Sequence, residues 1–400
     1  SPRFAARPLG FALAAGLMLP LMVAAQGVLP STQMNIDRAA PAPVAKVVRI
    51  GHVAPISGEL AHLGKDNELG ARMAINALNS MNVTMQGMPV VWELQTEDDH
   101  ADPKEAVAAA RRLVGGGVHG VVGHLNSGAS IPGAAIYDAA GIPMVTPSST
   151  NPKLTRLGYP GVFRLVGDDM QMGEQLGRVA VEKFRAKKIF VVDDRTFYGS
   201  YLAEGFIEGV RKAGSDITEQ AFLREGNKDY RAVAKRAQAI GPDIVFFAGM
   251  DADAAPLLQE LVRAGVRSFL IGGDGMCSSD LPRLAGPALG EERVLCAEAG
   301  GVTSSEADAL KAFKENFRKQ YGQDVQIYAP YSYDAVMVLA NAMIAANSAA
   351  PQDYLPKLKS APYTGVTGLI SFDGRGDLLK PAFTMMTFKG GQRVTAGVVR

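Results

Sequence analysis

Two stretches of the sequence decide the fold: VHGVVGHLNS at residues 118–127 and IPMVTPSST at residues 142–150. Each begins with a short apolar run that is typical of a buried strand and ends in a loop of small polar residues. The stretch SFLIGGDG at residues 268–275 repeats this pattern in the second half of the chain. Because ligands of open α/β sheets bind beyond the carboxyl ends of the strands, we expect these three polar loops to lie at a binding site.

Short β-rich runs alternate with amphipathic helices from Val47 onward. The helix expected over residues 102–114 has a well-marked start, since Asp102 can cap it and Glu105 has the spacing of a capping box. The alternation restarts at residue 187, where a strand precedes the helix expected over 198–214. Two βαβα halves predict an α/β fold with two mostly parallel sheets, each flanked by helices on both faces.

The last part of the chain is expected to return to the first half. Helices are predicted over 304–322 and 331–346, and the alternating tail at 366–388 predicts a hairpin around Asp373 and Gly374. Two lobes joined by several crossings would enclose a cleft. The expected division is a signal peptide over 1–25, a flexible lead over 26–46, a first lobe over 47–167 and 299–381, and a second lobe over 168–298 and 382–400.

Composition is that of a globular protein. The 400 residues are 47% hydrophobic, and 41 Lys and Arg against 40 Asp and Glu give a net charge of +1. This is enough chain for two sizeable cores, and the balanced charge argues against nucleic acid as a partner.

The first 25 residues carry Arg3 and Arg7, then an apolar run that ends in small residues. This order is typical of an export signal, with cleavage expected after about Ala25. A retained membrane anchor is the alternative, because the run nearly reaches the roughly 20 residues that a spanning helix needs. We expect export to the periplasm.

The polar loops carry complementary chemistry. The hydroxyl and backbone N–H groups of Ser127, Ser148, Ser149 and Thr150 suit a carboxylate, and Asp274 suits an ammonium group. Together they predict a site for a zwitterion. Taken singly, each residue has a plainer interpretation: residues 148–150 as a turn that caps the next helix, and Asp274 as a turn residue between glycines.

Enzyme and metal motifs do not fit. GGGVHG at 115–120 satisfies G-x-G-x-x-G, yet it follows a helix and precedes a strand, the reverse of the dinucleotide-binding context. The five histidines form no HExxH motif and no metal-ligand spacing with the cysteines. DDHAD at 98–102 could bind calcium weakly, but helix capping explains it better. We therefore expect no catalytic residues, no metal and no cofactor.

From about Val47 to the C-terminus the chain resembles the periplasmic leucine/isoleucine/valine-binding proteins of ABC transporters, which are two-lobed type I solute-binding proteins. The resemblance covers nearly the whole of the expected mature chain. Besides GHLNS and IPMVTPSST, the stretches that carry it are GHVAPISGELAHLG (51–64), EDDHADPKEAV (97–107), YGSYLAEGF (198–206) and TGLISFDGRGDL (367–378).

The resemblance implies a role for individual residues. Ser127, Ser148 and Thr150 would hold the ligand carboxylate and share its amine, and Asp274 would complete amine recognition. Tyr198 would close over the ligand from the second lobe, with Tyr328 near the ligand side chain. The sequence departs from the family at two wall positions, where aromatic residues are replaced by Leu63 and Met250, which makes the pocket softer.

The resemblance also implies a function. We expect an extracytoplasmic, monomeric solute-binding protein that captures an aliphatic L-amino acid such as Leu, Ile or Val and delivers it to the permease subunits of an ABC transporter. The alternative is an amide or amino-acid sensor domain that signals to a partner, and an enzyme of unknown chemistry is a distant third.

The two cysteines, Cys277 and Cys296, have 296 − 277 − 1 = 18 residues between them. Export to an oxidising compartment and an even count favour a disulfide, which would tie the loop of Asp274 to the strand expected around residue 296. Two buried free thiols are the alternative.

Overall fold

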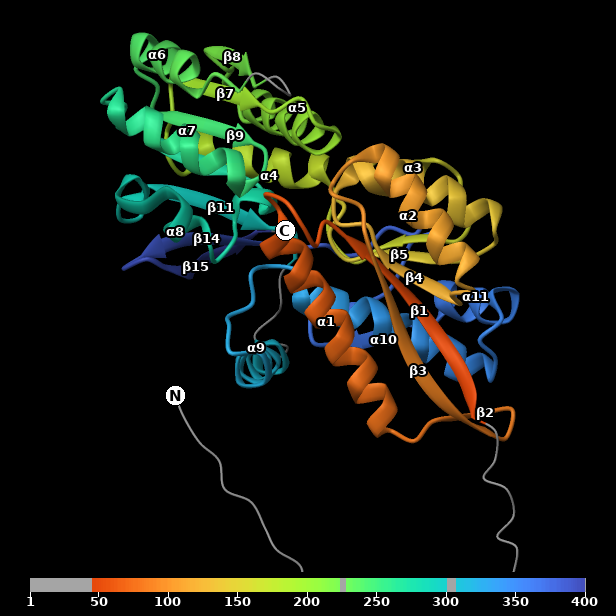
Figure 1. Cartoon of the computed structure of the whole chain (residues 1–400). Helices are drawn as coiled ribbons and strands as arrows, with labels where there is room; N and C mark the ends of the chain where they lie inside the picture. The colour runs from red at the N-terminus through yellow and green to blue at the C-terminus, as the bar shows by residue number, and fades with distance from the viewer. Residues whose placement is uncertain (1–44, 224–227, 301–306, 400) are drawn as a thin grey trace, which may run out of the picture. The chain divides into compact units, whose positions relative to one another are not determined.

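The structure is a computed structural model that describes residues 45–223, 228–300 and 307–399. These residues form two large sheets, each flanked by helices (Figure 1). The expected signal peptide and all but the last two residues of the expected lead lie outside the described part. Within that part, every helix is too short or too polar to span a lipid bilayer.

The first sheet is parallel except for β2 at its edge. Helices α1 and α10 pack against each other on one face, and α2 and α3 do so on the other. The strands in spatial order are β2 (Thr84–Met85), β3 (Met88–Asp98), β1 (Lys46–Ala54), β4 (Gly120–Gly123), β5 (Met144–Thr146) and β6 (Val162–Arg164), and the helices are α1 (Ala61–Ser80), α2 (Pro103–Gly115), α3 (Ser127–Ala139), α9 (Ala307–Tyr321), α10 (Ala329–Ala346) and α11 (Pro351–Ser360).

Side-chain alternation along β1 explains this layering. Val48 and Ile50 are buried in the cluster that includes α1 and α10, whereas Val53 is buried in the cluster of α2 and α3. Residues 50–54, the second half of β1, are all buried, as expected for a parallel strand that is covered on both faces. The start of α2 is as predicted, because the Asp102 side chain accepts hydrogen bonds from the N–H groups of Lys104 and Glu105.

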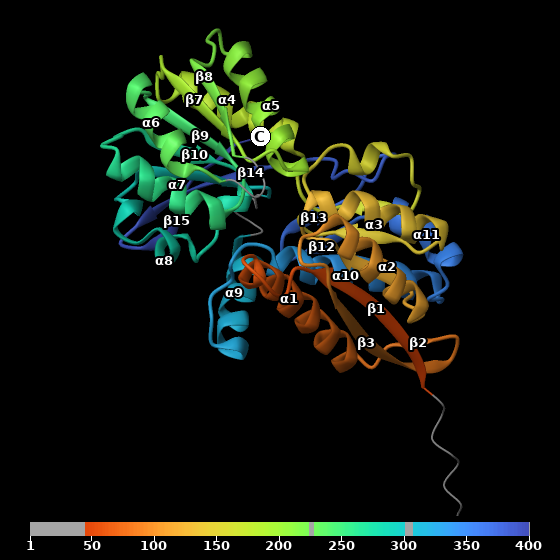
Figure 2. The same ribbon diagram turned by 45° about the horizontal axis from the view of Figure 1, so that its top comes forward.

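The second sheet is parallel except for β14 and β15. Helices α4 and α5 cover one face, and α6 to α8 cover the other (Figure 2). The strands in spatial order are β15 (Gln392–Val399), β14 (Phe383–Lys389), β11 (Val294–Glu298), β10 (Phe269–Gly272), β9 (Ile244–Ala248), β7 (Ile189–Asp193) and β8 (Glu219–Phe222), and the helices are α4 (Asp169–Glu182), α5 (Phe197–Lys212), α6 (Tyr230–Ile240), α7 (Asp251–Arg263) and α8 (Leu281–Ala285).

The chain passes from the first sheet to the second after β6, returns after β11, and passes over again before β14. The two-domain α/β class expected from the sequence is therefore correct. The exact boundaries of the two expected lobes stay a prediction.

The tail hairpin expected around Asp373 and Gly374 is not a regular ladder. In the described residues Phe372 and Leu378 form one isolated bridge, and β13 (Gly368–Ile370) pairs with β12 (Tyr363–Gly365) instead. The loop is held by β6: the Arg164 N–H donates to the Gly376 carbonyl at 2.9 Å, and the Arg164 guanidinium pairs with Asp377. Two backbone hydrogen bonds also close this loop, from the Asp373 N–H to the Asp377 carbonyl at 2.8 Å and from the Leu379 N–H to the Ser371 carbonyl at 2.9 Å. The chain then continues into β14 of the second sheet.

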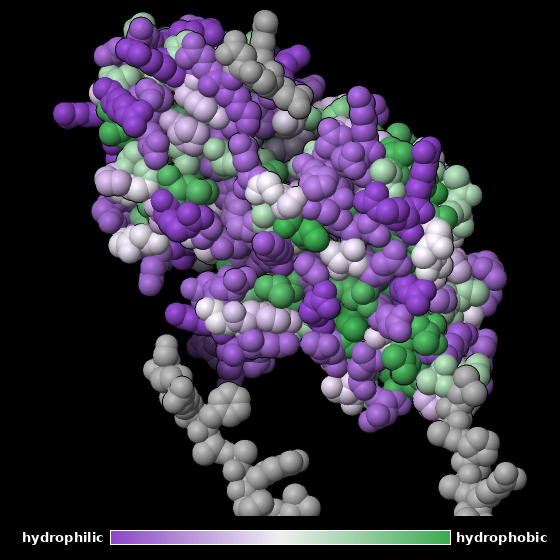
Figure 3. All heavy atoms as spheres, viewed as in Figure 1, coloured by the Kyte–Doolittle hydropathy of each residue, from purple (hydrophilic) through white to green (hydrophobic). Residues whose placement is uncertain are grey.

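Hydrophilic residues dominate the face drawn in Figure 3, with hydrophobic residues between them in small groups. The exposed large apolar side chains are spread over separate elements, such as Met81 after α1, Val262 in α7 and Leu369 in β13.

Asp66 of α1 fixes the entry to α10. Its fully buried carboxylate accepts hydrogen bonds from four consecutive backbone N–H groups at 2.7 to 3.1 Å, those of Gln326, Ile327, Tyr328 and Ala329. Burial raises the pKa of Asp66, although the four hydrogen bonds favour its charged form. The residue that precedes α10 provides no side-chain cap, so the Asp66 carboxylate of α1 caps the N-terminus of α10 instead.

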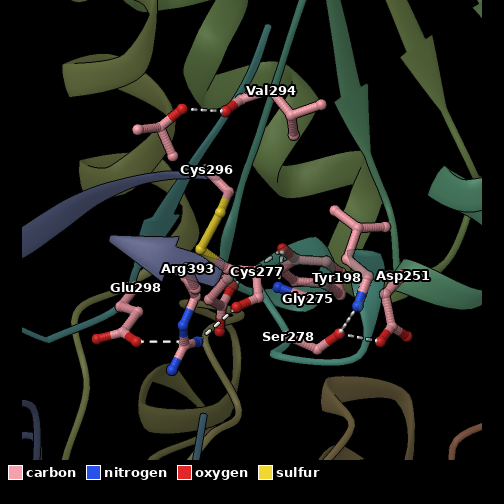
Figure 4. The surroundings of a disulfide bond; sticks show 12 residues. Tyr198, Asp251, Gly275, Cys277, Ser278, Val294, Cys296, Glu298 and Arg393 are labelled. Carbon is pink, nitrogen blue, oxygen red and sulfur yellow. Dashed lines mark hydrogen bonds and ion pairs between the residues drawn. A yellow bond between two sulfur atoms is a disulfide. The ribbon is translucent and has the colours of Figure 1, made fainter. Parts of the chain in front are cut away.

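A disulfide joins Cys277 and Cys296 (Figure 4). It ties the turn after β10, the 3₁₀ turn η2 (Asp274–Met276), to the neighbouring strand β11. Arg393 of β15 holds the same turn, because its guanidinium donates to the Cys277 carbonyl and pairs with Glu298 at 3.0 Å. The turn that carries Asp274 is thus attached to two strands of the second sheet.

We expect the double substitution Cys277→Ser and Cys296→Ser to lower the free energy of unfolding by about 3 kcal/mol, because the open chain regains the entropy that the disulfide removes. Urea denaturation of the oxidised wild type and of the variant measures the difference. Alkylation of unfolded, unreduced wild type followed by mass spectrometry is the control, and labelling of both cysteines would contradict the disulfide.

Asp66→Asn should lower the free energy of unfolding by about 3 kcal/mol, since an amide turns one acceptor into a donor that faces buried N–H groups. Asn76→Ala is the matched control on the exposed face of α1, where a change within about 0.5 kcal/mol is expected. Equal stability of the two variants would show that Asp66 does not cap α10.

Candidate functional site

The first polar loop leads from β4 into α3. Ser127 is the first residue of α3 and is 2% exposed. Its hydroxyl accepts a hydrogen bond from the Asn151 N–H at 3.2 Å, so the first loop is bonded to the end of the second. The carbonyl oxygen of the Asn126 side chain is buried and has no hydrogen-bond partner among the described residues. The positive end of the α3 dipole favours an anion here.

The second polar loop follows β5 and is hydrogen-bonded to the first. Ser148 donates its hydroxyl to the Leu125 carbonyl at 3.2 Å, and the Ser149 hydroxyl lies 3.1 Å from the His124 carbonyl and 3.0 Å from that of Leu125. Both serines are buried. Their hydroxyl protons are therefore used within the protein. The N–H groups of Ser148 and Ser149 also donate to the Thr146 hydroxyl oxygen, at 3.3 and 2.9 Å, so these serines offer a ligand mainly their oxygen lone pairs.

A buried network beneath the loops sets their conformation. His124 is fully buried, with Nδ1 at 2.7 Å from Asp99 Oδ2 and Nε2 at 3.1 Å from the Tyr137 hydroxyl. Thr146 donates its hydroxyl to the His124 carbonyl at 2.9 Å. Burial raises the pKa of Tyr137 well above its usual value, so it stays a neutral partner. These side chains position the loops rather than face a ligand.

The third loop centres on Asp274, which is 1% exposed. Its Oδ1 accepts the Tyr198 hydroxyl and its Oδ2 accepts the Tyr328 hydroxyl, each at 2.9 Å. The Gly275 N–H donates back to the Tyr198 oxygen at 3.0 Å. Tyr198 lies in α5 and Tyr328 precedes α10, so the carboxylate joins segments of both sheets.

Burial of the Asp274 carboxylate disfavours its charged form. Burial raises the pKa of Asp274 to about 6, although the bonds from Tyr328 and Tyr198 favour the charged form. Burial and the Asp274 charge raise the pKa values of both phenols well above their usual value, so both remain hydrogen-bond donors. A buried carboxylate with only neutral partners suits a cationic ligand group.

Asp169 is a second buried carboxylate that sequence reasoning missed. It is fully buried in the first turn of α4, and its two oxygens accept no hydrogen bond of good geometry among the described residues. Burial raises its pKa well above the usual value. The nearby charge of Asp274 adds to the shift, and Thr150 and the charge of Arg164 oppose it. The two carboxylates therefore lie close enough to interact, and Thr150 lies beside them.

The structure thus brings most of the predicted residues together. Asp274 contacts Tyr198 and Tyr328 directly, and the Asp169 N–H donates to the Thr150 carbonyl at 2.8 Å. Asn151 links the two sheets, since it bonds Ser127 and its amide donates to the Phe197 carbonyl at the start of α5. Asp169 had one signal in the sequence: Asp168 already forms the capping box of α4, so a second acidic residue beside it is surplus to capping.

The predicted wall residues flank this cluster. Leu63 of α1 is fully buried in the same apolar cluster as Tyr328 and Leu125. Met250 precedes α7 and packs partly buried against the clusters on both faces of the second sheet, close to Gly275. The structure therefore places each of them next to a polar loop. Their role against a ligand stays a prediction.

Comparisons with known proteins identify the family of this chain. Residues 47–392 match the family described as periplasmic binding protein. The Leu/Ile/Val-binding protein homolog 1 of Brucella abortus is 31% identical over 345 residues, which are 86% of this chain and 91% of that protein. The leucine-, isoleucine-, valine-, threonine-, and alanine-binding protein of Pseudomonas aeruginosa is 30% identical over 85% of this chain and 90% of its own length.

A solved structure shows the same likeness. The substrate-binding protein of the branched-chain amino acid transporter of Streptococcus pneumoniae, in complex with isoleucine, gives a TM-score of 0.81 at 26% identity, over 88% of this chain and 99% of that one. The resemblance inferred from the sequence motifs is confirmed. The chain belongs to the periplasmic binding protein family.

Proposed function

We propose that this protein binds an aliphatic L-amino acid of the leucine, isoleucine or valine type. The observation that carries the proposal is the pair of buried carboxylates, Asp274 and Asp169, with no cation hydrogen-bonded to them among the described residues. An α-ammonium group supplies the missing positive charge and the N–H donors that these oxygens lack.

The serine and threonine loops accommodate the other end of the zwitterion. The N-terminal turn of α3, with the Ser127 hydroxyl, and the backbone N–H of Thr150 are donors for the α-carboxylate. Thr150 lies beside Asp169, so it is placed to contact both ends of the ligand. A free α-amino acid therefore matches the site better than a simple carboxylic acid does, because the acid leaves the buried anions unpaired.

We assign the apolar side chains of Leu63 and Met250, near Tyr328, to the contact with the ligand side chain. Apolar walls favour an aliphatic side chain and penalise a charged one, which would lose its hydration there without a partner. The names of the relatives from Brucella abortus and Pseudomonas aeruginosa, and the isoleucine in the Streptococcus pneumoniae structure, support the same class of ligand.

We further propose that the protein is exported to the periplasm by cleavage of its signal peptide, acts as a monomer, and delivers its ligand to the permease subunits of an ABC transporter without chemical turnover. The ligand would first bind the loops of the first sheet, at Ser127 and Thr150. The second domain, which carries Tyr198 and Asp274, would then close by rotation about the crossings after β6, after β11 and before β14.

Asp274→Asn should weaken leucine binding by about 10- to 150-fold, which corresponds to the loss of a charge-assisted bond of roughly 1.5–3 kcal/mol. The pKa of about 6 also sets a pH dependence. The ligand-free carboxylate takes up a proton as the pH falls through 6, and the bound ammonium opposes this, so wild-type affinity declines on the acid side.

Isothermal titration calorimetry at several pH values measures both effects. Glu208→Gln, at an exposed position of α5, is the control and should bind like wild type. The assignment of Asp274 to the amine would be wrong if Asp274→Asn bound leucine as tightly as wild type.

A thermal-shift screen across the amino acids tests the pocket. Leu, Ile and Val should raise the melting temperature, since a ligand at 100 times its dissociation constant adds about 2.7 kcal/mol of stability. Asp, Glu and Lys should give no shift, because their side-chain charges have no partner beside Leu63 and Met250. Tight binding of an acidic or basic amino acid would place the wall elsewhere.

A further inference from the structure

One ion pair joins elements of the two sheets outside the cluster around Asp274. His62 is the second residue of α1, and its Nε2 lies 2.6 Å from Oδ2 of Asp251, the first residue of α7. Helix α1 packs on the first sheet, and α7 packs on the second. In sequence, His62 precedes Leu63 and Asp251 follows Met250, so the pair adjoins both proposed wall residues.

Asp251 needs a positively charged partner. It is fully buried, and its Oδ1 has no hydrogen-bond partner among the described residues. Its Oδ2 also accepts the hydroxyl of Ser278, which follows the disulfide-linked Cys277 (Figure 4). A position in the first turn of α7 stabilises the negative charge in part. His62 is the ionisable side chain that can bring a positive charge to Asp251.

His62 has charged groups around it from several segments. Its side chain is 18% exposed and borders a surface hollow that it shares with Lys65 of α1, Asp280 and Asp324. Burial opposes protonation, and so does Arg283 of α8. The hydrogen bond and charge of Asp251, together with Asp280, outweigh them and raise the pKa of His62.

The arrangement is not a catalytic one. His62 and Ser278 both approach Oδ2 of Asp251, so the histidine is not bonded to the serine hydroxyl. A hydrolytic triad needs the histidine between the serine and the acid, where it can take the serine proton. The geometry is that of a carboxylate held by two donors from different segments.

We propose that His62 and Asp251 are positioning residues for ligand capture: their ion pair holds α1 against α7 around the bound ligand and makes ligand affinity depend on the protonation of His62. The proposal rests on the proposed function. The histidine is free to take its ordinary pKa when the domains separate, and binding then raises that pKa. The affinity that the ion pair adds is present in full when the pH is below the pKa of His62 in the ligand-free protein. It is lost as the pH rises through the higher pKa of His62 in the bound protein.

Calorimetric titration with leucine between about pH 5.5 and pH 8.5 tests this, with wild type compared to His62→Gln. Glutamine keeps a donor for Asp251 but carries no charge. At the acid end, wild type should bind leucine more tightly than His62→Gln, by about tenfold for each unit by which binding raises the pKa of His62. The ratio of the two affinities should shrink toward one at the alkaline end. Asp274 titrates in both proteins, so its effect cancels in the ratio.

His100→Gln is the matched control, since His100 is an exposed histidine paired with Asp98 within the first domain. It should bind leucine like wild type at every pH. A proton NMR titration of the histidine ring signals, with His62 assigned through its variant, adds a readout that a merely structural role would not move. The pKa of His62 should rise when leucine is added.

The outcomes separate the two proposals. A wild-type to His62→Gln affinity ratio that is the same at every pH, or a His62 pKa that leucine leaves unchanged, overturns the ion-pair proposal while leucine binding stands. Failure of wild type to bind leucine at any pH overturns the proposed function, and the ion-pair proposal falls with it.

Discussion

The structure depends on the cost of burying negative charge beside three polar loops. Asp274 and Asp169 are withdrawn from water and interact with each other, and burial raises the pKa of each. Hydroxyl groups of tyrosine and threonine offset part of that cost, yet they bring no opposite charge. The cluster is incomplete in that no cation is hydrogen-bonded to either carboxylate among the described residues, although the charge of Arg164 acts on Asp169. That incompleteness is what distinguishes a ligand site from a satisfied polar core.

The carboxylates are useful only because the backbone around them is fixed. In the first domain the buried His124 and its partners set the two serine loops, and in the second the disulfide and Arg393 hold the turn of Asp274. Each domain therefore presents a preformed half of the proposed site. Rigid halves reduce the ordering that binding must enforce, so less of the interaction energy is lost to entropy.

Local sequence patterns predicted the fold well, but they could not predict contacts between residues that are far apart in the sequence. The strand-then-loop stretches and the Asp102 cap are readable because each lies within a few residues. The carboxylate of Asp66 and its partner Gln326 are 260 residues apart, and no local pattern joins them. Asp169 was missed because a neighbouring Asp168 already satisfies the capping rule. The tail hairpin is present only as a short pairing around the Phe372 and Leu378 bridge.

The starts of α1 and α7 connect the proposed His62 and Asp251 ion pair to the proposed ligand pocket. Both helices direct their N-terminal ends toward the His62 and Asp251 contact, and two positive dipole ends repel each other. The Asp251 carboxylate between them offsets this repulsion, and a proton on His62 converts the remaining contact into an ion pair. Leu63 and Met250 adjoin these same two residues. The separation of the helix starts therefore sets the distance between the proposed walls of the pocket.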